Sequence, residues 1–274
     1  MTTKIREFTE KDFSTLLKLL NEAYKDSFEF IPYTEETLHK RIQDENVKVL
    51  VAEENGRIAG TVAYHDGFWG EEIEWLATRD ALNRRELENL LVSEVEKFVK
   101  EGKILFGGSA GTLNISEWKE RGYQPENGFY RMTANLDAEL PLPPVPEGVT
   151  VRCLKAGEEE ELVKAVNAGF GWERLKMGSI QFWKTENPPF DESWVQVAVA
   201  NNKIVSAVVA RPDTHYNEFF NKRRAHLGPA TTLPKYRRKN LATILTIEAM
   251  NFLFRKGFTS VALGVAEQNI ASFT

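Results

Sequence analysis

Cysteine is almost absent from this sequence: Cys153 is the only one in 274 residues. A single thiol excludes an internal disulfide framework and a cluster of thiolate metal ligands, which fits a reducing compartment. The four histidines share no ligand spacing, so we expect no metal site. Residues 1–10 hold no apolar core of the signal-peptide type, and no run approaches the roughly 18 apolar residues of a membrane span. These absences predict a cytoplasmic protein that does not enter a membrane.

Positive charge is outweighed in this chain, which carries a formal net charge of -5. With 42% hydrophobic and 27% charged residues, the composition predicts a soluble globular protein with room for two ordinary domains. The acidic balance argues against a nucleic-acid partner. Basic residues gather at 222–224 and 235–239. Local clusters in an acidic protein suit a small anionic ligand, although residues 222–224 would also fit a solvated charged face.

The segment from Leu233 to Ala242 joins a strand-like run to an amphipathic helix through a loop rich in cations. Pro234 indicates a strand end because its ring removes a ladder donor. From Leu241 to Phe252, apolar residues recur at helical spacing. The first amides of a helix have no intrahelical acceptor, and the helix dipole adds positive charge there. The segment therefore predicts a site for a polyphosphate, with a basic turn that caps the helix by chance as the alternative.

The two halves of the chain repeat each other on either side of a proline-rich segment, residues 137–148. Four prolines in that segment favour an extended connector between domains. At an offset of 146 residues, Arg6 matches Arg152 and Asn21 matches Asn167. Later the offset becomes 155, so the second half has gained nine residues between two strand-like runs. Each half alternates strands and helices, which predicts an α/β (α+β) fold with a mixed sheet flanked by helices.

The basic loop resembles a motif of the GNAT superfamily of acyl-CoA-dependent N-acyltransferases. That motif reads Arg/Gln-x-x-Gly-x-Gly/Ala after a strand ending in a Pro-x-Tyr-Arg type of sequence, and Pro234, Tyr236, Arg237 and Ala242 fall on it. Asn240 stands where the family has its first glycine, and asparagine tolerates a left-handed backbone better than most residues. The resemblance covers nearly the whole chain. It implies two tandem GNAT-like domains, each a mixed twisted sheet flanked by helices.

The resemblance also sets the domain limits that we expect. They are a degenerate GNAT-like domain at 1–136, a linker at 137–148, and a GNAT-like domain with the intact loop at 149–274. A strand-like run at 129–134 would close the first domain. Nothing corresponding follows Thr274, so we expect that the protein continues beyond this residue. A measured mass equal to that of residues 1–274 would contradict this expectation.

The first half is expected to have lost its donor site. Its equivalent loop, residues 81–89, has no small residue where the backbone must approach an anion. Glu86 and Glu88 would place carboxylates against a pyrophosphate. Trp118 stands where the family has its tyrosine acid. Such a copy would shape the substrate cleft or the domain interface.

For the second half, the resemblance implies transfer of an acyl group to a primary amine of a small molecule or peptide, most simply acetyl from acetyl-CoA. The pyrophosphate would rest on amides at the helix start, and the pantetheine arm would pair with the strand end. No metal is required. The residues with these expected donor-binding roles are Thr231, Thr232, Leu233, Arg237, Arg238, Lys239, Asn240, Leu241, Ala242 and Asn269. For Asn269, an ordinary helix N-cap is an equally good interpretation.

His226 is the best-placed candidate for the catalytic base, because it lies on the strand that leads into the loop and a histidine pKa lies near working pH. A satisfied packing residue is the alternative interpretation. Glu218 and His215, on the extra segment of the second half, are weaker candidates and would also fit a substrate lid. The family's acid is a tyrosine whose place lies beyond Thr274.

Two other functions remain open at this point. A catalytically inactive acyl-CoA-binding sensor or structural module would account for Asn240 in place of glycine. A tandem transferase that takes its acyl group from charged tRNA would need a broad basic surface, which the acidic balance disfavours. The expected partners are an amine acceptor and, in a homodimer, a second copy of the chain. Neither nucleic acid nor a membrane is expected.

Overall fold

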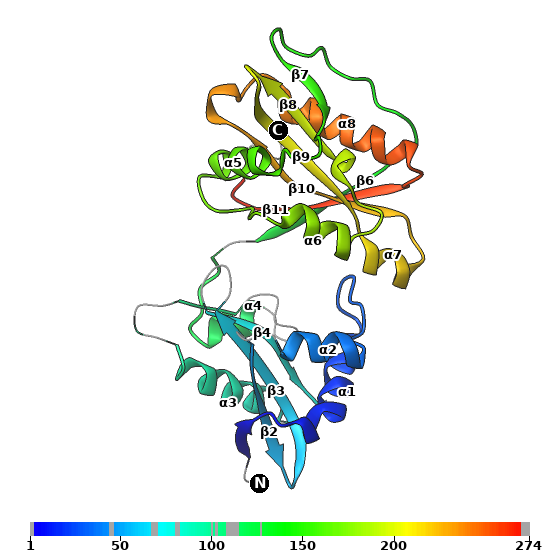
Figure 1. Ribbon diagram of the computed structural model, residues 1–274. Helices are drawn as coiled ribbons and strands as arrows, with labels where there is room; N and C mark the ends of the chain where they lie inside the picture. Colours follow the sequence, from blue (N-terminus) through cyan, green and yellow to red (C-terminus); the bar gives the residue numbers. More distant parts are fainter. Residues whose placement is uncertain are drawn as a thin grey trace. The chain divides into compact units, whose positions relative to one another are not determined.

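A computed structural model shows two compact units, residues 1–126 and 127–274, and each is described by itself (Figure 1). The structure describes residues 3–43, 47–66, 71–79, 83–99, 101, 104–107, 115–126 and 128–269.

The first unit is built on a five-stranded sheet in the order β1-β2-β3-β4-β5. Its strands are β1 (Lys4–Glu7), β2 (Lys48–Glu54), β3 (Arg57–Asp66), β4 (Glu71–Thr78) and β5 (Leu105–Phe106). Only the pairing of β4 with β5 is parallel in this described sheet. Its helices are α1 (Phe13–Tyr24), α2 (Glu35–Ile42), α3 (Arg84–Glu96) and α4 (Ile115–Glu120). One apolar cluster joins α1 and α2 to the sheet and a second joins α3 and α4 to it, so two layers of helix enclose the strands.

The second unit has a six-stranded sheet in the order β6-β11-β10-β9-β8-β7. Its strands are β6 (Phe129–Asn135), β7 (Thr150–Cys153), β8 (Val195–Ala200), β9 (Lys203–Pro212), β10 (Arg224–Thr232) and β11 (Ser260–Ala266). Its helices are α5 (Glu159–Phe170), α6 (Ser179–Glu186), α7 (Thr214–Phe220) and α8 (Leu241–Arg255). The β10–β11 pair is parallel and the other pairs are antiparallel. The extra segment predicted in the second half forms α7, between β9 and β10.

Strand β6 belongs to the second sheet. It pairs antiparallel with β11 along its whole length, from Ser260↔Asn135 to Ala266↔Phe129. The prediction that this run closes the first domain was therefore wrong, and the compact units divide after Glu126 rather than after Leu136. The prediction assumed that each copy of the repeat supplies the last strand of its own sheet. A strand from the other copy can also pair with the open edge of β11.

The proline-rich segment contains no helix or strand and contacts the second unit. Leu136, the residue before it, is 6% exposed and belongs to the core of that unit. Asn251 of α8 is buried, and its side-chain amide binds the backbone of Leu140 in this segment. Leu140 N–H donates to Asn251 Oδ1 at 2.7 Å, and Asn251 Nδ2 donates to Leu140 O at 2.9 Å. The segment is thus fixed along α8.

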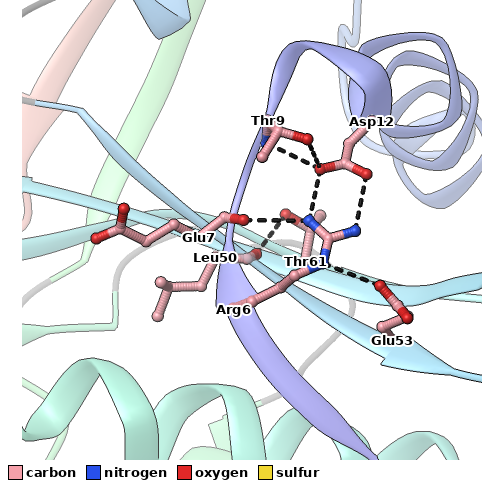
Figure 2. A network of polar contacts seen from close by, with 7 residues as sticks. All are labelled: Arg6, Glu7, Thr9, Asp12, Leu50, Glu53 and Thr61. Carbon is pink, nitrogen blue, oxygen red and sulfur yellow. Dashed lines mark hydrogen bonds and ion pairs between the residues drawn. The ribbon is translucent and has the colours of Figure 1, made fainter. Parts of the chain in front are cut away.

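The repeat is visible in polar networks that the two halves share. Figure 2 shows Arg6 donating hydrogen bonds to both carboxylate oxygens of Asp12 and, through Nε, to Glu53. The two bonds to Asp12 measure 2.6 and 2.9 Å. In the second unit, Arg152 grips both oxygens of Glu158 at 2.8 Å. These bidentate pairs hold the turn into the first helix of each unit. In each pair the guanidinium lowers the pKa of the carboxyl below its ordinary range.

A second shared network closes the loop after the first helix of each unit. Asn21 Nδ2 donates to Tyr33 O at 2.9 Å, and Tyr33 N–H donates back to Oδ1 at 2.8 Å. Asn167 makes the same two bonds to Leu175, both at 2.8 Å. The same side chain at the same place in both units supports the duplication that the sequence predicts.

Candidate functional site

The sheet of the second unit opens between β10 and β11. These strands pair over three described residue pairs, Arg224↔Ser260 to His226↔Ala262, although β10 runs on to Thr232 and β11 to Ala266. A bulge in β10 lies at the opening, where the register with β9 shifts between Leu227 and Ala230. Beyond His226, β10 thus keeps β9 on one edge, and no described strand pairs with its other edge, here called the free edge.

The free edge of β10 carries backbone groups that an extended ligand can reach. Leu233 N–H donates to Val205 O at 2.9 Å, so this amide and, by alternation, that of Thr231 face β9. The amides of Ala230 and Thr232 then face the free edge. Of the three residues expected to pair with pantetheine, Thr232 is the one whose amide faces this edge.

The basic loop leaves β10 and enters α8 through two residues with positive φ, Arg238 at 63° and Asn240 at 58°. Asn240 is the N-cap of α8 and adopts the left-handed conformation, which is the backbone state that glycine supplies in the motif. Its side chain makes no capping bond. The first amides of α8, from Leu241 onward, therefore remain directed at whatever lies before the helix.

Arg237 is committed to the loop itself. Its Nε donates to Thr232 O at 3.2 Å and its Nη2 donates to Gly169 O at 2.9 Å. The side chain thus ties the loop to the ends of β10 and α5. Arg238 and Lys239 are exposed, and Lys239 Nζ lies 5.5 Å from the Tyr236 ring centre. These two side chains therefore remain the candidates for contact with a phosphate at the start of α8.

Helix α5 comes unusually close to β10 because of Gly169. A Cβ atom at this position would lie 1.9 Å from Thr231 Oγ1 and 3.2 Å from Thr231 Cβ. The absence of a side chain lets the end of α5 rest against the strand that leads into the basic loop. Gly169 was not identified from the sequence, since a glycine inside a helical pattern usually signals only weaker helix propensity.

His226 is half-buried on β10, immediately before the bulge. Its Nε2 points towards Gly228 and lies 3.6 Å from where a Cβ of that residue would be. Burial, followed by the charges of Arg211 and Arg131, lowers its pKa from 6.5 to about 4. The expectation of a pKa near working pH was therefore wrong. At pH 7 the imidazole is neutral and can accept a proton, but it is a weak base.

The weaker catalytic candidates lie on helix α7 and not on β10. Glu218 and His215 are exposed on α7. The same helix places the ring of Tyr216 3.2 Å from the guanidinium carbon of Arg224. Asn269 donates its N–H to Ala266 O in a turn after β11 and is the last described residue. The sequence beyond it, including the end of the chain, lies outside the described residues.

Sequence reasoning missed the arginines beside His226. Arg211 and Arg224 sit in apolar strand runs, where a charged side chain is unusual, and that is the signal that could have identified them. Arg131 escaped notice because its strand was assigned to the other half. Long-range pairing brings all three into one unit.

In the first unit, the start of α3 differs from the start of α8 because charged side chains pair with one another there. Glu88 of α3 is fully buried and accepts from Arg84 Nη1 at 3.1 and 3.2 Å, and Arg84 Nη2 donates to Glu117 at 2.9 Å. Part of the loop predicted to be equivalent, residues 81–82, lies outside the described residues. Trp118 packs against Gly107 at the end of β5. Within the described residues, the first turns of α3 thus hold an Arg84–Glu88–Glu117 network, whose carboxylates would repel an anion.

Comparisons with known proteins agree with this architecture. Residues 159–273 match the family model described as the acetyltransferase (GNAT) family. No curated protein sequence matches the chain. No helix in the described residues has the length and apolar character to cross a membrane.

Solved structures share the fold over nearly the whole chain. A GCN5-related N-acetyltransferase from Sphaerobacter thermophilus has a TM-score of 0.67 at 15% identity, covering 97% of this chain and 87% of its own. A tandem GNAT protein from the clavulanic acid biosynthesis pathway has a TM-score of 0.63 at 14% identity, covering 98% and 91%. A glucosamine N-acetyltransferase region of a fungal multi-domain β-N-acetylglucosaminidase reaches 0.68 at 13% identity, covering 95% of this chain but 35% of the other. The predicted fold class is confirmed: residues 159–273 match the acetyltransferase (GNAT) family, and the chain as a whole shares the fold of a tandem GNAT protein.

Proposed function

We propose that the protein is an acyl-CoA-dependent N-acyltransferase that moves acetyl from acetyl-CoA to a primary amine of a small molecule or peptide. The observation that carries this proposal is the continuous path in the second unit from the free edge of β10, through Asn240, to the open amides of α8. The free edge would receive the pantetheine arm as an added strand. The α8 amides, with Arg238 and Lys239, would receive the pyrophosphate.

In the reaction, the amine nitrogen attacks the thioester carbonyl carbon, the C–S bond breaks, and CoA leaves as a thiolate. The amides of Ala230 and Thr232 face the edge where the carbonyl oxygen would lie and would stabilise its developing charge. The amine must be neutral to attack, which costs about 4 kcal/mol at pH 7 for an ordinary pKa of about 10. Nearby guanidinium groups lower that cost because like charges disfavour the ammonium form, and neutral His226 would accept the proton.

The first unit is proposed to be structural, since Glu88 and Arg84 fill the start of α3. With the acetyl donor confined to the second unit, each chain would have one active site.

The proposal is tested by donor binding and by turnover. Acetyl-CoA at 100 times its Kd should add about 2.7 kcal/mol to the free energy of unfolding. Thiol release across a panel of amines then measures transfer. Ala242→Glu is the matched control: Ala242 is exposed in the first turn of α8, where a carboxylate stabilises the helix dipole but repels pyrophosphate. This variant should remain folded and lose both effects.

Absence of any stabilisation by acetyl-CoA would overturn the proposal. Binding without thiol release for any amine would instead favour the catalytically inactive acyl-CoA sensor.

A further inference from the structure

A group of arginines surrounds His226, away from the donor loop. Arg211 of β9 lies opposite His226 in the strand register, and Arg224 lies two residues before it on β10. Residues paired across strands, or two apart on one strand, share a face of the sheet, so these three side chains do so. Strand β6 adds Arg131, whose Nη2 is 3.6 Å from Asp213 Oδ2.

Among the charged groups that act on His226, three arginines, Arg211, Arg131 and Arg224, face one carboxylate, Asp213. Asp213 already serves two arginines, since Arg224 Nη2 also lies 2.6 Å from its Oδ2. Arg211 is half-buried, and within the described part of the chain its buried Nε has no hydrogen-bond partner. Burial and the charge of Arg174 both lower its pKa. A buried donor without an acceptor is costly, and an arriving anion would remove that cost.

Aromatic rings lie near two of the guanidinium groups. The Trp183 ring centre of α6 lies 5.0 Å from the guanidinium carbon of Arg211. Arg174, in the segment between α5 and α6, lies 5.7 Å from the Trp172 ring centre. The labels α6, α7 and β10 in Figure 1 locate these elements in the second unit. Rings stabilise cations but bring no negative charge, so the planar groups remain able to bind a carboxylate or phosphate.

We propose that this arginine cluster binds an anionic group on the acceptor, with Arg211 and Arg131 in direct contact and Arg174 beside them. The acceptors are then small amines that carry a carboxylate or phosphate, such as amino acids or amino-sugar phosphates. The placement suits the reaction, because His226 Nε2 points to the bulge of β10, beside the edge proposed for the thioester. This step rests on the proposed function, whereas anion binding by the cluster does not.

Anion binding also changes His226. Before binding, burial and the charges of Arg211, Arg131 and Arg224 hold its pKa at about 4, and Asp213 opposes them. A bound carboxylate offsets the arginines and raises the pKa of His226 towards its ordinary value. The base therefore becomes stronger when the acceptor arrives.

The test compares matched acceptors with the whole protein and acetyl-CoA. Thiol release gives kcat/KM for amino acids against their carboxamides, and for glucosamine 6-phosphate against glucosamine. We expect the anionic member of at least one pair to be preferred by roughly 30-fold, the scale of a lost charge-assisted contact. The carboxylate and phosphate arms identify which anion is used.

Variants locate the effect. Arg211→Gln should lower kcat/KM for the anionic acceptor by roughly 30-fold, mainly through KM, with a change under about threefold for its neutral partner. Arg131→Gln, at a more exposed position, should act in the same direction. The control is Arg223→Gln, which removes an equal charge next to Arg224 but from a side chain that donates to Lys256 O. It should leave both acceptors unaffected.

A second readout separates the two proposals. The His226 imidazole is titrated by NMR without acetyl-CoA, in the presence of the preferred anionic amine or its neutral partner. We expect the anionic amine alone to raise the pKa of His226 in the wild type, and this rise to disappear in Arg211→Gln. If transfer is equal for anionic and neutral amines, or if Arg211→Gln lowers both alike, the anion site is overturned and the transferase proposal stands. If no amine is acetylated but His226 still responds, the transferase proposal fails and the anion site stands. No response of His226 overturns the anion site.

Discussion

His226 shows how neighbours set the behaviour of a single residue. Its folded-state pKa of about 4 lies below the unfolded value of 6.5, so the unfolded chain binds the proton more readily. The contribution of His226 to stability is thus present above pH 6.5 and is lost as the pH falls towards 4. We predict that the wild type loses up to about 3 kcal/mol more stability than His226→Gln across this window.

Urea unfolding of both proteins at pH 7, 5.5 and 4.5 measures this difference. Parallel losses in the two proteins would mean that His226 titrates normally and that the arginines do not act on it.

At Gly169, a substitution to alanine is predicted to destabilise the protein although alanine has the higher helix propensity. In an open helix, Gly→Ala would stabilise by about 1 kcal/mol. Here the new Cβ meets Thr231, so Gly169→Ala should destabilise the protein and weaken acetyl-CoA binding by moving the end of β10. Thr231→Ala removes the nearest atom, and the double variant should recover part of both losses. The double-mutant cycle is measured by calorimetry for acetyl-CoA affinity and by unfolding for stability. Additive effects of the two changes would show that the contact contributes to neither.

Single residues differ in how far the sequence could predict them. Asn240 could be interpreted from its position in the motif, because few residues besides glycine accept the left-handed conformation that it adopts. The environment of His226 could not. Its charges come from β6, β9 and β10, and strands far apart in sequence become neighbours only through pairing. Local patterns contain no record of that pairing.

At the scale of elements, the asparagine clamps offer a matched pair. In the loop after the first helix, Asn21 satisfies two backbone groups and Asn167 satisfies three. Each Asn→Ala change should cost about 1–3 kcal/mol of stability. Only Asn167→Ala should also weaken binding of the anionic acceptor, because its loop carries Arg174, whose N–H donates to Asn167 Oδ1. Thermal unfolding and acceptor KM, measured on both variants, check this; an equal effect on KM would contradict it.

Most elements were predictable because each carries its own signal. Apolar spacing marks α8, and alternation with intervening turns marks the β8–β9 hairpin. Strand β6 was predicted as a strand but given the wrong sheet. All of its residues are exposed in the folded unit, so burial of one face does not select the sheet that it joins. The sheet that β6 joins depends on the available edge of β11, and the sequence of β6 contains no information about that edge.

For the whole molecule, duplication and divergence act on different parts. The pairs Arg6–Asp12 and Arg152–Glu158 keep the same turn in both units. The starts of α3 and α8 differ in chemistry. The buried Glu88 lies near the start of α3, whereas α8 follows Asn240 in the left-handed conformation. The shared framework therefore preserves the fold in both copies, while donor binding depends on a few residues at one helix start.

This asymmetry predicts one molecule of acetyl-CoA per chain. Calorimetric titration of the wild type should give a single site, and Ala242→Glu should abolish it by placing a carboxylate in the first turn of α8. The matched change in the first unit is Glu86→Ala, which removes an exposed carboxylate from the first turn of α3. It should create no second site, because Glu88 and Arg84 still fill that helix start. Two sites per chain, or binding that survives Ala242→Glu and falls with Glu86→Ala, would assign the donor to the first unit instead.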